Sequence, residues 1–127
     1  MRRAALLAGL VLALALPAAV ALASAPRATS VGVGEREWRV SLYRTRVPTG
    51  VVRLNVHNYG EDGHDLALRN RDGRVLATVP EVSPGEGDTL RVRLRRPGRY
   101  VVFCSLEGHE AKGMRARLVV VKRKPRG

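Results

Sequence analysis

Short stretches of alternating apolar and polar residues, separated by glycine and proline turns, constrain this chain more than any other feature. Val52, Leu54 and Val56 would share one face of a strand, because successive side chains of a strand point to opposite sides of the sheet. Similar stretches predict strands over residues 38–43, 51–58, 65–69, 74–79, 89–94, 100–104 and 114–122. No amphipathic helix of useful length is visible in the sequence. The spacing predicts an all-β fold of seven or eight strands, either an antiparallel sandwich or a barrel.

The first 23 residues resemble a targeting leader. Two arginines follow Met1, residues 4–23 contain no polar or charged side chain, and residues 21–23 have the small-x-small pattern of a cleavage site. We therefore expect residues 1–23 to be a signal peptide and the mature chain to begin at Ser24. The protein would then work in the periplasm, the cell envelope or the extracellular space. An uncleaved membrane anchor is the alternative, because about twenty apolar residues can span a bilayer.

Composition divides the rest of the chain. Residues 24–34 are small and polar without periodicity, which predicts a flexible tether; residues 35–122 form the predicted domain, and residues 123–127 a basic tail. The formal net charge is +12 at pH 7, of which the leader contributes two charges. A basic exported domain suits acidic partner proteins or anionic membrane surfaces. Aromatic residues make up only 4%, so nucleic acid is a poor alternative. Nothing in the sequence requires more than a monomer.

Cys104 is the only cysteine of the chain, and it ends a nearly all-apolar stretch that is typical of a central strand buried on both faces. A lone thiol outside the cytoplasm has no internal disulfide partner and is open to oxidation. His109 follows five residues later, and Met114 five residues after that. Thiolate, imidazole and thioether together suit copper that cycles between Cu(I) and Cu(II), whereas zinc has no use for a thioether.

A second imidazole is needed for a trigonal site with two histidines and one cysteine. His57 is in register with outward-facing residues of a predicted strand, which is typical of a solvated surface histidine. His64 ends a glycine-bearing loop just before a strand, and functional side chains collect on such loops. We therefore expect His64, and not His57, to join Cys104 and His109.

Three stretches carry a resemblance to a known family. Residues 47–50 (VPTG) resemble the turn before the family's second main strand, and Asn58-Tyr59-Gly60 followed by His64 resembles the approach to its first ligand. Residues 103–109 (FCSLEGH), followed by Gly113-Met114, resemble the ligand loop, which is the most specific of the three motifs. The chain is similar over residues 35–122 to the cupredoxin family, the group that includes plastocyanin, azurin and amicyanin.

The resemblance implies a Greek-key antiparallel β-sandwich that holds one copper ion. His64, Cys104 and His109 would be the strong equatorial ligands, and Met114 the weak axial ligand. Two residues depart from the family pattern. Glu107 stands where many members have proline, and Asp65 where several have the asparagine that ties the two ligand loops together. Asp65 can still accept a hydrogen bond from Ser105.

The function that the resemblance implies is that of a type 1 (blue) copper protein, which carries single electrons between redox partners of the cell envelope and is not an enzyme. The electron would pass through the edge of His109, beside a docking patch that includes Leu106 and Ala111. The alternative is an envelope protein that delivers copper to an oxidase or another acceptor. Such proteins tend to use methionine-rich surface sites, and this chain has only Met1 and Met114. A copper oxidase or nitrite reductase would need a second copper site and a longer chain.

Overall fold

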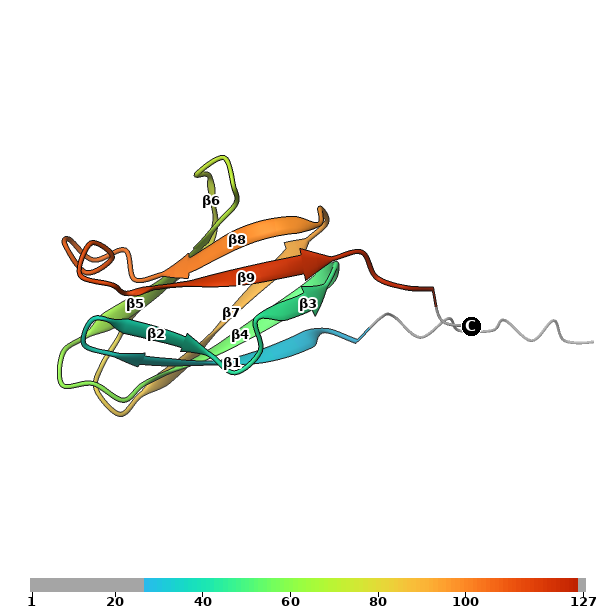
Figure 1. The fold of residues 1–127 in the computed structure, drawn as a ribbon. Helices are drawn as coiled ribbons and strands as arrows, with labels where there is room; N and C mark the ends of the chain where they lie inside the picture. The colour runs from blue at the N-terminus through green and yellow to red at the C-terminus, as the bar shows by residue number, and fades with distance from the viewer. Residues whose placement is uncertain (1–26, 126–127) are drawn as a thin grey trace, which may run out of the picture.

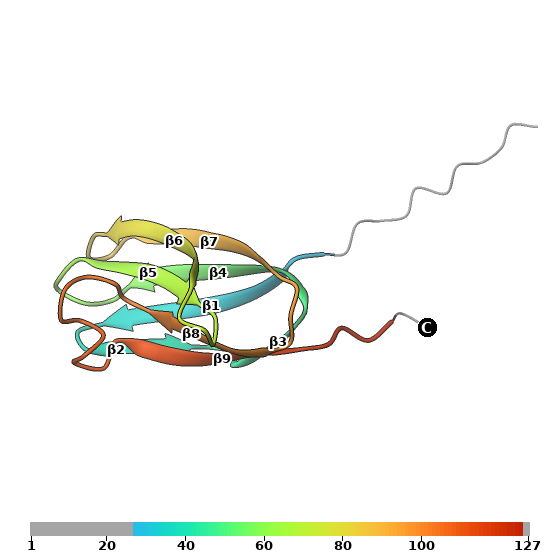
Figure 2. The same ribbon diagram turned by 90° about the horizontal axis from the view of Figure 1, so that it is seen from above.

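The computed structural model describes residues 27–125, which form two β-sheets packed face to face (Figures 1 and 2). This part of the chain has nine strands: β1 (Thr29–Arg36), β2 (Arg39–Leu42), β3 (Arg46–Pro48), β4 (Gly50–Asn58), β5 (His64–Arg69), β6 (Val75–Val82), β7 (Gly87–Leu94), β8 (Gly98–Phe103) and β9 (Arg115–Val121). One sheet has the order β2-β1-β4-β7 and the other β3-β9-β8-β5-β6. The predicted β-sandwich is confirmed, with nine strands instead of seven or eight. Within residues 27–125, no helix is long and apolar enough to cross a membrane.

The core between the sheets follows the alternation in the sequence. In β4, Val52, Leu54 and Val56 are buried, whereas Arg53 and Asn55 between them are exposed. β8 is the middle strand of its sheet, hydrogen-bonded to β5 on one side and to β9 on the other. The nearly unbroken apolar sequence of β8 fits this central position, as predicted.

Two strand pairs are parallel, which corrects the prediction of an antiparallel sandwich. β1 runs parallel to β4 and β3 runs parallel to β9, while the other pairs of the described sheets are antiparallel. An alternating sequence buries the same side chains whichever way its neighbour runs. The hydrophobic pattern therefore predicted the partner strands β4 and β9 but not the direction of the two pairs. β1 and β3 themselves were not among the predicted strands, and Val47 and Pro48 of β3 were expected in a turn.

Residues 29–34, predicted to belong to a flexible tether, instead form most of β1 and open the folded domain. Val31, Val33 and Glu35 point into the core and are at most 1% exposed. Glycines 32 and 34 occupy the outward positions between them, so the segment looked small and aperiodic in the sequence. The predicted signal peptide, residues 1–23, lies outside the described residues.

The loops that follow β1, β4 and β8 gather at one end of the sandwich, and the chain leaves β9 at the opposite end (Figure 1). In the view of Figure 1 these loops lie at the left, and the end of β9 lies toward the right. Every residue predicted to bind the metal lies at or beside the loop end.

Candidate metal centre

The loop between β8 and β9 begins at a fully buried cysteine. Cys104 directly follows the central strand β8 and is 0% exposed. Its backbone N–H donates to the Met114 carbonyl at 3.1 Å, and the Met114 N–H donates to the His109 carbonyl at 3.2 Å. These bonds close residues 104–114 into one loop, which we call the ligand loop. The Met114 side chain is also 0% exposed, at the end where the loop returns to the sheet.

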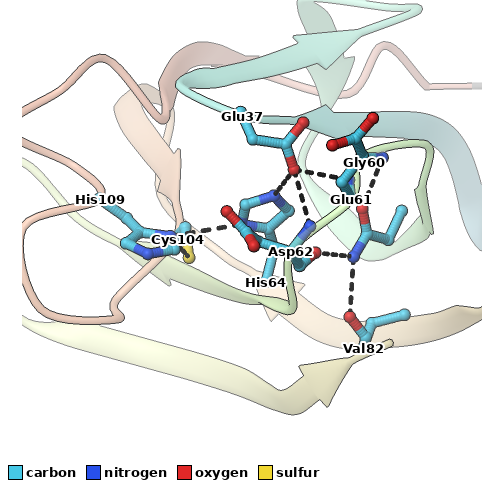
Figure 3. A network of polar contacts seen from close by, with 9 residues as sticks. Glu37, Gly60, Glu61, Asp62, His64, Val82, Cys104 and His109 are labelled. Atoms are coloured by element: carbon cyan, nitrogen blue, oxygen red, sulfur yellow. Dashed lines mark hydrogen bonds and ion pairs between the residues drawn. The ribbon is translucent and has the colours of Figure 1, made fainter. Parts of the chain in front are cut away.

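His64 comes from the loop between β4 and β5, which Asn58 holds in shape. The buried Asn58 amide donates to the carbonyls of Asp62 at 2.7 Å and Val82 at 2.9 Å, and its oxygen accepts from the Gly60 N–H at 2.8 Å (Figure 3). His64 begins β5 and is 0% exposed. The Asn-x-Gly motif of the sequence thus acts by shaping the loop that carries the histidine.

The two loops bring three of the predicted ligands together. The ligand atoms of His64, Cys104 and His109 all lie within 4.8 Å of one another. The Nδ1 atoms of the two histidines are 3.3 Å apart, and the Cys104 sulfur lies 3.5 Å from Nδ1 of His109. Atoms that bind one ion at about 2.0–2.3 Å and surround it trigonally are separated by similar distances. His57 lies on the outer face of β4 against Tyr59, outside this cluster, as predicted.

The surroundings of Cys104 decide its protonation. Burial is the largest effect and raises the pKa of the thiol to about 11, while the backbone N–H groups of Leu106 and Asp65, which bond to the sulfur, act in the opposite direction. The thiol therefore keeps its proton at neutral pH. A metal ion that binds the thiolate must displace this proton, so metal binding and proton release are coupled.

Asp65 ties the two ligand-bearing loops together. One carboxylate oxygen accepts the Ser105 backbone N–H at 2.5 Å, and the other accepts the Ser105 hydroxyl. The expected bond between these residues is confirmed, with aspartate in the place of asparagine. Asp65 follows His64 and Ser105 follows Cys104, so the bonds fix the two ligands relative to each other.

A second brace joins the far side of the ligand loop to β5. Arg69 donates to both carboxylate oxygens of Glu110, at 2.8 and 2.5 Å, and its guanidinium lies over the Phe103 ring, 4.3 Å from the centroid. The pair holds Glu110, the residue after His109, against the sheet. Glu107, in contrast, is exposed on the same loop.

Two residues of the β1–β2 turn, Glu37 and Trp38, lie against the cluster, and neither was predicted to belong to the site. Glu37 Oε1 is 3.3 Å from Nε2 of His64, and the Trp38 ring meets the His109 ring edge-on with centroids 5.2 Å apart. Trp38 was predicted to begin a strand; instead it occupies the turn with a φ of 62°. No sequence signal marks these contacts, because they depend on the register of β1, which was itself mistaken for a tether.

Comparison with known proteins shows the fold. No protein-family model matches the sequence, and no curated protein does. Solved structures do match: auracyanin B at 21% identity (79% of this chain, 93% of that chain, TM-score 0.61) and reduced rusticyanin at 16% identity (76% and 81%, TM-score 0.62). Auracyanin A, a "blue" copper protein from the green thermophilic photosynthetic bacterium Chloroflexus aurantiacus, matches at 15% identity (75% and 100%, TM-score 0.59). The chain has the cupredoxin fold.

Within the cupredoxin fold, the clustered side chains fit one copper ion. A thiolate and two imidazoles with converging nitrogen atoms form the trigonal donor set that blue copper sites use, with a weak thioether as the usual fourth ligand. The buried cysteine and the buried His64 would shield the ion, and His109 is the one member of the three that is partly exposed.

Proposed function

We propose that this protein is a type 1 copper protein that carries single electrons outside the cytoplasm. One copper ion would be held by His64, Cys104, His109 and Met114. The observation that supports this most directly is the convergence of the two Nδ1 atoms and the thiol sulfur, from loops forty residues apart, within 4.8 Å. When bound, copper supplies a one-electron couple that the protein itself lacks.

The residues of the chain would keep the geometry fixed while the charge of the ion changes. The Asp65–Ser105 bonds and the Arg69–Glu110 pair hold the two ligand-bearing segments together without contribution from a metal. A preformed ligand set needs little rearrangement between the two oxidation states, which favours rapid electron exchange. Supporting bonds of this kind also tune the properties of metal sites.

Electrons would enter and leave through His109. Its ring is partly exposed, and Leu106 and Ala111 lie beside it on the ligand loop, half-buried and exposed respectively. Such a small apolar surface suits a brief encounter with a redox partner. The positive net charge would favour an acidic partner.

Repeated reduction and reoxidation, with a measurement of how much copper the protein keeps, distinguishes electron carriage from copper delivery. The copper-loaded protein is reduced and reoxidised repeatedly in the presence of a Cu(I) chelator, and both the visible spectrum and the chelator-bound copper are recorded. A carrier keeps its copper and recovers its spectrum after each cycle. Transfer of the reduced ion to the chelator within the first cycles would contradict electron carriage and support delivery.

A further inference from the structure

The β1–β2 turn contacts both histidines of the cluster. Glu37 lies beside His64, while Trp38 lies edge-on to His109, with Lys112 Nζ placed 3.9 Å from the Trp38 ring centroid. The turn comes from the first sheet, whereas the three clustered residues come from the end of the second sheet and its loops. One side of the site is therefore formed by Glu37 and Trp38, which precede the nearest ligand, His64, by 27 and 26 residues in the sequence.

The Glu37 carboxylate is fixed in place by the loop that carries His64. Its Oε1 accepts the backbone N–H groups of Glu61 at 2.7 Å and Asp62 at 2.9 Å, and the same oxygen faces His64 Nε2 (Figure 3). These two N–H donors favour the ionised carboxylate over the protonated acid, so Glu37 places a fixed negative charge beside His64.

Gly60 makes room for this carboxylate. A Cβ atom at position 60 would lie 2.3 Å from Oε1 of Glu37 and 2.9 Å from its carboxyl carbon. Any larger residue at this position would push the Glu37 side chain away from the loop. The close approach of Glu37 therefore depends on a specific glycine of the Asn-x-Gly motif.

The position of Glu37 determines which nitrogen of His64 is free. An ionised carboxylate can only accept hydrogen bonds, so a neutral imidazole beside it carries its proton on Nε2. The opposite nitrogen, Nδ1, is then unprotonated and points toward Nδ1 of His109. A carboxylate on the outer nitrogen of a ligating histidine also makes the imidazole a more basic ligand.

Resting on the proposed function, we propose that Glu37 is a positioning residue of the copper site: it holds His64 in the tautomer with a free Nδ1 and stabilises Cu(II) relative to Cu(I). The negative charge next to the imidazole favours the more highly charged ion. Glu37 therefore lowers the reduction potential of this protein. A purely structural role, as a cap for residues 61 and 62, would affect stability alone.

The reduction potentials of copper-loaded full-length variants test this proposal. Glu37→Gln keeps an acceptor oxygen but removes the charge, and Gly60→Ala displaces the carboxylate without changing any charge. We expect each substitution to weaken the binding of Cu(II) relative to that of Cu(I) by about tenfold or more. For a one-electron couple, a tenfold change raises the reduction potential by about 59 mV. Glu107→Gln is the matched control, because it removes the same charge from an exposed side chain of the ligand loop. Shifts no larger than that of the control would overturn the proposal.

The tautomer of the His64 ring can be measured in the metal-free protein and tests the positioning role of Glu37 independently of copper. Nitrogen-15 NMR of the metal-free full-length protein should show His64 protonated on Nε2, and Glu37→Ala should populate the other tautomer. An unchanged tautomer in Glu37→Ala would overturn the positioning role. Failure of the proposed function is distinguishable, since the unsubstituted protein would then lack a blue copper spectrum altogether, whereas failure of this inference leaves that spectrum intact.

Discussion

At the scale of single residues, burial raises the pKa values of two acidic groups, the Cys104 thiol and the Glu35 carboxyl. Burial raises the pKa of the Cys104 thiol and keeps it protonated. The backbone N–H groups that bond to its sulfur lower the pKa, but their effect is smaller than that of burial. Glu35 of β1 is 0% exposed, and neither of its carboxylate oxygens has a hydrogen-bond partner among the described residues. Burial, and to a smaller extent the charge of Asp65, raises the pKa of Glu35 to about 8. Glu35 is therefore neutral at pH 7, which reduces the cost of burying it.

This neutral carboxyl makes the stability of the protein pH-dependent. Between pH 4.5, its ordinary pKa, and about pH 8, unfolding allows Glu35 to ionise, so the free energy of unfolding falls as pH rises and levels off above pH 8. The loss attributable to Glu35 is on the order of 3–5 kcal/mol. Urea unfolding of the unsubstituted protein and of Glu35→Gln between pH 5 and 9 measures this. The difference in stability between the two should change in favour of the variant as pH rises; a constant difference would contradict the assignment.

The residues that cluster at the site were largely predictable from the sequence, whereas the residues that surround them were not. Cys104, His109 and Met114 are close in sequence after one buried strand, and the loop position of His64 separated it from the strand-borne His57. Glu35 and Glu37 could not be assigned from sequence. Their environments arise from the packing of β1 against the second sheet, and two glutamates on either side of Arg36 give no sign of this in the sequence.

The ligand loop and β1 are the two elements that the site needs most. In the ligand loop, Gly113 has a φ of 123°, and a Cβ atom there would lie 2.8 Å from the Trp38 carbonyl oxygen. The loop therefore packs directly on the β1–β2 turn just before Met114. In β1, Val33 is 1% exposed and pairs in register with Val56 of β4.

Gly113→Ala should destabilise the protein for two reasons, backbone strain and collision with the turn. Gly73→Ala is a matched control, because Gly73 also has a positive φ, 83°, but a Cβ atom at position 73 would meet nothing within 4 Å. Strain alone costs about 1–2 kcal/mol. We expect Gly113→Ala to cost at least about 1 kcal/mol more than the control in urea unfolding. Equal losses would show that the loop does not pack on the turn.

Val33→Ala tests whether β1 belongs to the folded domain. Removal of two buried methyl groups should lower the free energy of unfolding by about 1–3 kcal/mol. Ser30→Ala, at an exposed position of the same strand, should change it by less than about 0.5 kcal/mol. A negligible effect of Val33→Ala would instead support the flexible tether that the sequence suggested.

The strands other than β1 and β3 were predictable because an alternating pattern has one interpretation in a half-buried sheet. β4 and β7 show this directly. Neither β1 nor β3 was predicted as a strand, and their parallel direction was not predictable, since parallel and antiparallel neighbours bury the same residues. β1 was missed altogether because Gly32 and Gly34 remove the polar half of its alternation.

At the scale of the whole molecule, the chain has a large positive net charge and its candidate metal site lies at one end of the sandwich. The formal net charge is +12, and the exposed arginines of β7 and the following loop are part of this charge. The chain leaves β9 at the end opposite the ligand loop (Figure 1), so a partner could approach His109 without meeting the segment that directly follows β9. Long-range attraction of anions is the expected consequence.

Electron exchange should therefore depend on ionic strength. Oxidation of the reduced copper-loaded protein by hexacyanoferrate(III), an anion, should slow several-fold as the ionic strength rises from about 0.01 to 0.1 M, where the screening length falls from about 30 to about 10 Å. A cationic cobalt complex used as oxidant should show the opposite trend. Stopped-flow rates with both reagents measure this, and identical trends would contradict electrostatic steering.

The most direct test of the copper assignment is the visible absorption and electron paramagnetic resonance spectrum of the protein after addition of Cu(II), with Cys104→Ser measured beside it. We expect an intense blue or green thiolate-to-copper band and a narrow parallel hyperfine splitting, both absent from the serine variant. A pale sample with an ordinary tetragonal copper signal, or a serine variant that stays blue, would contradict the assignment of Cys104 and its neighbours as a type 1 copper site.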